Sequence, residues 1–167
     1  MQKQFANDRR IADVYGAPAR PLVTHAKLEV TSDLGELARV REFVRHICRE
    51  LNGPALDEIS TSEVQLAATE AASNIMRHAC QGRNDRTIDV RGEVLDDCVS
   101  IELSHEGDRF SVPESVDEPE VDENTEGGLG LYIMQEFLDD VVYTEKQHRR
   151  QSTTLIKNRQ RDTATES

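Results

Sequence analysis

A chain of 167 residues can bury one hydrophobic core and is short for two, so the sequence indicates a single main domain. Its formal net charge of −12 argues against a nucleic-acid-binding surface, which needs clustered Lys and Arg, and suits a partner with a basic surface. No apolar run approaches the roughly 20 residues that cross a bilayer, and the N-terminal residues lack the apolar core of a signal peptide. Three cysteines without a C-x-x-C pair fit a reduced, cytoplasmic compartment.

The sequence of the N-terminal third predicts a flexible arm, a strand and a helix. Residues 1–21 are polar and contain Pro18 and Pro21, which is typical of a mobile segment. Residues 22–30 alternate loosely between apolar and polar and predict a strand. Leu, Val and Ile recur at helical spacing over residues 34–51 and predict a helix. Asp33 together with Glu36 is expected to cap the start of this helix.

A second helix is predicted over residues 60–79. Ser60 is followed three residues later by Glu63, which is a capping-box pattern. The apolar positions that follow are mostly small, with alanine dominating. At helical spacing these positions form a wide apolar face.

The remaining elements alternate between strands and one more helix. Strands are predicted over 87–95 and 98–104, a long acidic loop over 106–126, a helix over 129–138, and a closing hairpin over 141–145 and 153–157. We therefore expect a domain over residues 22–158 and a disordered tail over 159–167. Its predicted class is a two-layer α/β (α+β) sandwich, with helices on one face of a mostly antiparallel sheet.

Two motifs suggest chemistry. Glu70, Asn74 and His78 recur every four residues, so an α-helix places them on one stripe. An amide oxygen can ligate a hard cation, and a carboxylate can accept a proton. Taken alone, the stripe also suits the solvated face of an ordinary amphipathic helix.

The second motif is a glycine-rich segment that leads into the helix over 129–138. Glycines let a backbone approach a phosphate, and a helix N-terminus offers free N–H groups. A flexible linker is the plain alternative. The residues concerned are Gly127, Gly128, Leu129, Gly130 and Leu131.

Together the two motifs resemble the N box and the G2 box of the GHKL ATPase/kinase superfamily. Within that superfamily the chain is most similar to the RsbW/SpoIIAB type of anti-sigma factor and serine-protein kinase, from about residue 26 to residue 157. The resemblance implies a Bergerat-type fold that binds ATP and Mg2+. It implies Glu70 as general base, Asn74 as the Mg2+ ligand, His78 near the phosphates, and the segment from Gly127 to Leu131 as the phosphate loop.

The resemblance also implies a set of residues that bind the adenine base, and in this set the chain departs from the family pattern. The G1 box begins at Ser104, and His105 stands where the family has an aspartate that accepts from the adenine amino group. Gly107 and Phe110 fit the pattern, and Asp108 or Glu106 could replace the aspartate. Thr153 occupies the place of a family threonine and could donate its hydroxyl, although a threonine on an edge strand is an equal alternative. The lid ahead of Gly127 is acidic, where the family often has a basic residue.

The leading functional expectation is an ATP-dependent serine/threonine-protein kinase that is also an anti-sigma factor. The resemblance implies a sigma factor as one partner, an anti-sigma factor antagonist (a STAS-domain protein) as the phosphorylated partner, and a homodimer. The alternative is a partner-switching module of the same fold with little or no kinase activity. A histidine-kinase fragment is a weaker possibility, because no phospho-acceptor helix pair precedes the domain.

Overall fold

The computed structural model describes residues 22–51, 53–107 and 128–160. Within these residues, five strands form one sheet in the order β1-β2-β3-β5-β4, and every neighbouring pair is antiparallel. The strands are β1 (Leu22–Thr31), β2 (Thr87–Leu95), β3 (Cys98–Glu106), β4 (Asp140–Lys146) and β5 (Arg150–Asn158). The arm over 1–21, most of the acidic loop and the end of the tail lie outside the described residues.

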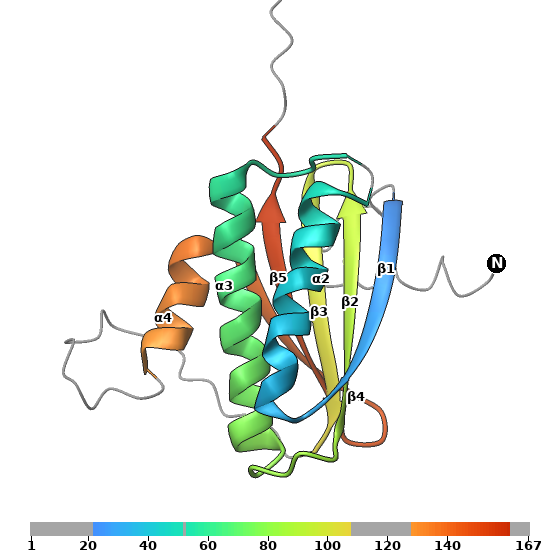
Figure 1. Cartoon of the computed structure of the whole chain (residues 1–167), viewed down its shortest axis with the longest axis vertical. Helices are drawn as coiled ribbons and strands as arrows, with labels where there is room; N and C mark the ends of the chain where they lie inside the picture. The colour runs from blue at the N-terminus through green and yellow to red at the C-terminus, as the bar shows by residue number, and fades with distance from the viewer. Residues whose placement is uncertain (1–21, 52, 108–127, 161–167) are drawn as a thin grey trace, which may run out of the picture.

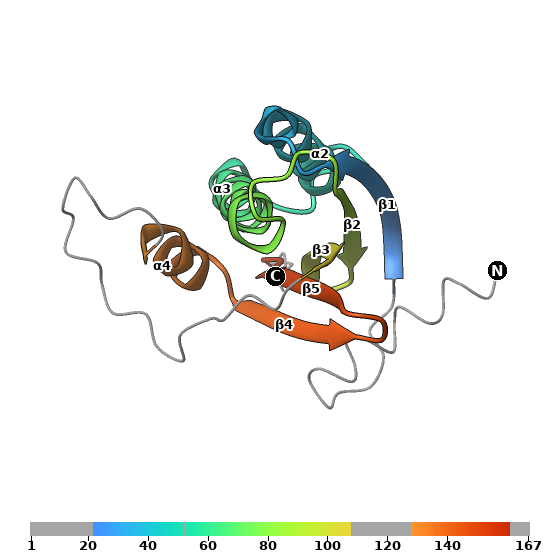
Figure 2. The ribbon, with the colours of Figure 1, turned by 90° about the horizontal axis from the view of Figure 1, so that it is seen from below.

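The helices form a single layer on one face of this sheet (Figures 1 and 2). Helix α3 lies between α2 and α4, and it contacts both. The bounds are η1 (Leu34–Glu36), α2 (Leu37–Arg49), α3 (Glu58–Asn74), the π-helical turn η2 (Ile75–Ala79) and α4 (Gly128–Phe137). The predicted two-layer α+β sandwich is confirmed.

Alternation along the strands decides which face of the sheet is covered. On β2, Ile88, Val90 and Val94 are buried against the helices, in what we call the inner face. The residues between them, including Arg91 and Glu93, belong to the opposite, outer face. The inner face therefore carries the core, and it also carries the residues of the site described below.

Small residues allow the helices to approach the sheet and each other. Gly92 lies under α2, where a Cβ atom would stand 2.4 Å from Cγ1 of Ile47. Helix α3 buries mainly alanines, so its axis can lie close to its neighbours. The wide apolar face predicted for this helix is buried.

Both ends of α3 differ from the prediction. Asp57 is the N-cap, with Oδ1 accepting from the backbone N–H of Ser60 at 2.7 Å, so Ser60 is already inside the first turn. Glu63 does not close a capping box; its carboxylate pairs with Lys157 at 2.8 Å. After Asn74 the helix widens into η2, and the N–H of Cys80 donates to the carbonyl of Ile75, five residues earlier.

Candidate functional site

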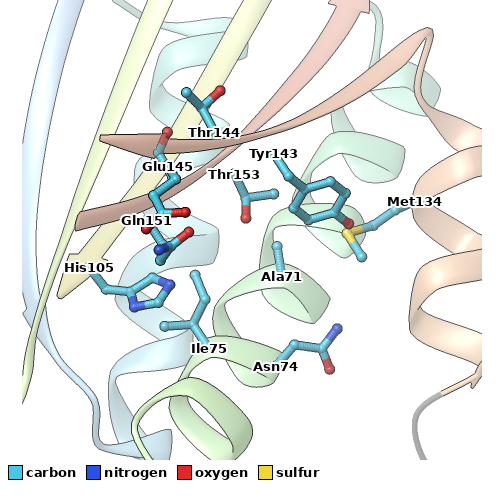
Figure 3. A pocket seen from close by; sticks show the side chains of 11 residues that line it. Ala71, Asn74, Ile75, His105, Met134, Tyr143, Thr144, Glu145, Gln151 and Thr153 are labelled. Atoms are coloured by element: carbon cyan, nitrogen blue, oxygen red, sulfur yellow. The ribbon is translucent and has the colours of Figure 1, made fainter. Parts of the chain in front are cut away.

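A cavity lies between the end of α3, the inner face of β3, β5 and β4, and α4 (Figure 3). It brings together three residues that the sequence predicted for one site: Asn74, His105 and Thr153. The space open to the centres of water-sized molecules is about 60 Å³, which is room for several waters. Its lining residues are Ala71, Asn74, Ile75, His105, Met134, Tyr143, Thr144, Glu145, Gln151, Ser152 and Thr153.

Strand register explains why these side chains meet. His105 of β3 lies directly opposite Gln151 of β5, and Gln151 lies opposite Glu145 of β4. One step further along the strands, Thr153 lies opposite Tyr143. Because opposed residues share a face, a polar row crosses the inner face at the edge of the core.

His105 is the most enclosed polar group in this row, at 3% exposure. Its Nδ1 atom has no hydrogen-bond partner. Burial lowers the pKa of His105 below its ordinary value of 6.5; a hydrogen bond with the backbone of Glu106 opposes this in part, and the charge of Arg150 adds to it. At neutral pH the ring is therefore uncharged, and it presents one donor and one acceptor nitrogen.

Glu70 lies one turn before Asn74 on α3, outside the set of residues that line the cavity. Its carboxylate lies against α4 at Gly130, where a Cβ atom would stand 2.6 Å from Oε2 of Glu70. Only a glycine at position 130 leaves room for this carboxylate in its present place. The half-buried Glu70 thus lies against the first turn of α4.

The other predicted site residues lie elsewhere. His78 is exposed in η2 and does not line the cavity; the stripe with Glu70 and Asn74 required α-helical spacing, which ends at Asn74. Gly107 has a φ of 150° that favours glycine, and its N–H donates to the carbonyl of Arg149 at 3.4 Å. With Glu106, Gly107 lines a separate polar hollow between η2, the end of β3 and the β4–β5 turn.

The glycine-rich segment is described in part. Gly128 begins α4, with Leu129, Gly130 and Leu131 following in its first turn, so the predicted helix is confirmed. Gly127 lies outside the described residues, as do Asp108, Phe110 and the acidic lid. Among the described residues, Glu106 does not replace His105 in the cavity, because it is exposed and faces the other hollow.

The comparisons with known proteins agree with this fold. Residues 30–157 match the family described as the histidine kinase-like ATPase domain. The chain belongs to the histidine kinase-like ATPase domain family. Serine-protein kinase RsbW of Staphylococcus aureus (strain MRSA252) is 32% identical over 117 residues, which are 65% of this chain and 72% of that protein.

Two Bacillus proteins are similar to this chain over a shorter segment. Serine-protein kinase RsbW of Bacillus licheniformis is 34% identical over 97 residues, and that of Bacillus subtilis (strain 168) is 30% identical over 96 residues. In each case the matched segment is 53% of this chain and 59% of the relative. The chain therefore spans less than two thirds of the length of these Bacillus proteins.

Sequence reasoning missed several residues that line the cavity in this family member, chiefly Gln151, Tyr143 and Met134. A signal for Gln151 existed, since it stands two positions before Thr153 and so on the same strand face. Its meeting with His105 depends on the pairing of β3 with β5, which no local pattern specifies.

Neither a metal cage nor a membrane span is found in the described part of the chain. No three His, Cys, Asp or Glu side chains gather there as a metal site. No described helix is long and apolar enough to cross a bilayer.

Proposed function

We propose that this protein binds ATP with Mg2+ and transfers the terminal phosphoryl group to a serine or threonine of a partner protein. The observation that carries the proposal is the cavity itself. Asn74, His105 and Thr153 come from one helix and two strands far apart in the sequence, and they line one partly open cavity. The names of the relatives, serine-protein kinases, support the same reaction.

Glu70 is the proposed general base. A hydroxyl that attacks the terminal phosphorus must lose its proton as the new O–P bond forms and ADP departs. Glu70 is one turn from Asn74 on α3, and its carboxylate is held against the first turn of α4. It can accept that proton while the hydroxyl oxygen is held in line.

The single amide oxygen of Asn74 fits a Mg2+ ion that takes most of its ligands from water and phosphate. Mg2+ in phosphoryl-transfer sites usually keeps several waters and uses one or two protein oxygens together with phosphate oxygens. Asn74 would hold the ion through its amide oxygen, and the ion would neutralise phosphate charge. The absence of a multi-carboxylate cluster among the described residues agrees with such a site.

The proposed partners follow from the same relatives. We infer that the substrate is an anti-sigma factor antagonist of the STAS type, and that the protein otherwise holds a sigma factor as a homodimer in the cytoplasm. The net charge of −12 supports binding to a basic partner such as a DNA-binding factor. A partner-switching module without kinase activity is the second candidate, favoured by His105 in place of a carboxylate.

Phosphate transfer tests the proposal directly. Wild-type protein with labelled Mg·ATP and a candidate antagonist is expected to label the antagonist on Ser or Thr. Glu70→Gln should lower the transfer rate about a hundred- to ten-thousand-fold, with nucleotide affinity little changed. Glu63→Gln is the matched control, because Glu63 lies on the same helix and pairs with Lys157 instead.

Two outcomes would contradict parts of the proposal. Binding of both Mg·ATP and the antagonist without transfer would favour the partner-switching module. Equal rates for wild type and Glu70→Gln would leave the kinase in place and remove Glu70 as its base.

A further inference from the structure

The inner face holds two polar side chains, His105 and Gln151, that have hydrogen-bonding capacity left over within the described part of the chain. His105 has an Nδ1 atom without a partner although the residue is 3% exposed. Gln151, directly opposite on β5, has no hydrogen bond to its side-chain amide within the described residues. Buried polar groups are normally paired, so an unpaired group in a cavity wall points to a ligand.

Both side chains can act as donor or as acceptor. A neutral imidazole can carry its proton on either nitrogen, so it can present a donor or an acceptor at Nδ1. The amide of Gln151 exchanges its oxygen and its NH2 group by rotating. Burial lowers the pKa of His105, which keeps the ring in the neutral form that has this freedom.

Purine bases differ in the group at position 6. Adenine carries an amino group there, which donates, and guanine carries an oxygen, which accepts. An ionised carboxylate in the wall could only accept, so at position 6 it would pair with the amino group of adenine and not with the oxygen of guanine. An imidazole beside an amide can pair with either base by changing tautomer and rotating one group.

We propose that His105 and Gln151 read the purine of the bound nucleotide without selecting between a 6-amino and a 6-oxo base. This inference rests on the proposed nucleotide-binding function and adds to it which purine bases the site accepts. The protein accordingly binds guanine nucleotides about as well as adenine nucleotides, and either triphosphate can serve as phosphate donor. The wall of the cavity supports this, since Thr153 adds another group that both donates and accepts.

Calorimetric titration of the whole chain with Mg·ADP and Mg·GDP tests the inference without turnover. The two dissociation constants are expected to agree within about tenfold, because neither base leaves a buried polar group unpaired. A preference for ADP of more than about a hundredfold would overturn the inference and leave the nucleotide-binding function standing. If neither nucleotide binds, the proposed function fails and the inference fails with it.

Substitution at position 105 sharpens the result. His105→Asp supplies an acceptor only, so it should weaken GDP relative to ADP by about ten- to a hundredfold. His105→Asn keeps a group that both donates and accepts, and it should leave the ADP-to-GDP ratio near that of wild type; it also provides a second variant if a buried carboxylate prevents folding. His148→Asp, in the β4–β5 turn outside the cavity, is the charge-matched control. An unchanged ratio in a folded His105→Asp protein would show that His105 does not read the base.

Discussion

The two faces of the sheet use polar residues in opposite ways. On the outer face the charged side chains pair with each other: Arg91 with Glu93 at 2.7 Å, Lys146 with Glu102 at 3.0 Å, and Arg150 with Asp89. On the inner face His105 lies on the same strand as Glu102, and Gln151 lies next to Arg150, yet neither forms an ion pair among the described residues. The charged groups of these outer-face pairs are therefore satisfied within the fold, whereas Nδ1 of His105 on the inner face has no partner in the described part of the chain.

The largest expected effect tests the outer face. Arg91→Met removes the ion-pair partner of Glu93, and both side chains are largely buried, so the free energy of unfolding should fall by about 3 kcal/mol. Urea unfolding followed by circular dichroism measures this. Arg39→Met is the matched control, because the pair of Arg39 with Glu36 is exposed and should contribute less than about 1 kcal/mol. Equal losses in both variants would mean that the pairs on the outer face do not stabilise the fold.

Asn74→Ala tests whether the inner face serves a ligand. The amide of Asn74 has no hydrogen bond within the described residues and lines the cavity, so stability should be nearly unchanged. Affinity for Mg·ADP should fall at least about tenfold, because a direct oxygen ligand of the ion is lost. Ser73→Ala, the preceding residue, lies outside the cavity and should retain affinity. Retained affinity in Asn74→Ala would remove its metal role.

His105→Leu tests whether a polar residue of the inner face contributes to stability as the ion pairs of the outer face do. The substitution removes a buried polar group that has an unpaired nitrogen, so the free energy of unfolding should rise or change by less than about 1 kcal/mol. Nucleotide affinity should fall in the same variant. A loss of stability as large as that of Arg91→Met would mean that His105 is part of the structural network and not of a ligand site.

The smallest effect concerns pH. Because burial lowers the folded-state pKa of His105 below 6.5, the unfolded chain binds this proton more readily than the folded chain. The contribution of neutral His105 to the free energy of unfolding is complete above pH 6.5, and it is lost as pH falls through the folded-state pKa. Unfolding curves between pH 7.5 and about pH 5 should show this loss in wild type and a smaller one in His105→Leu. Identical curves would exclude His105 as its source.

Local sequence patterns were sufficient for the layers of this fold. Alternation located β2 at its observed bounds, and helical spacing located α2 and α4 to within a few residues. The start of α3 was misplaced because Ser60 with Glu63 imitates a capping box, while Asp57 three residues earlier is the cap. The π-helical turn that removes His78 from the stripe has no sequence signal, since it depends on how the end of α3 packs.

The candidate site was predictable where it depends on one element and not where it depends on pairing. Asn74 follows from its position on α3, and Thr153 from its place on the last strand. Gln151 became a neighbour of His105 only through the long-range register of β3 with β5. Likewise, the contact of Glu70 with Gly130 joins two helices whose relative position no local pattern specifies.

That contact between Glu70 and Gly130 also has a thermodynamic consequence. Any ligand that shifts the first turn of α4 also changes the space that is left to the Glu70 carboxylate. Linkage requires the reverse with equal magnitude, so a ligand that moves the Glu70 side chain must change the affinity of whatever binds at the first turn of α4. Occupancy at the start of α4 and occupancy at the end of α3 are therefore reciprocal quantities, and a measurement of either one reports on both.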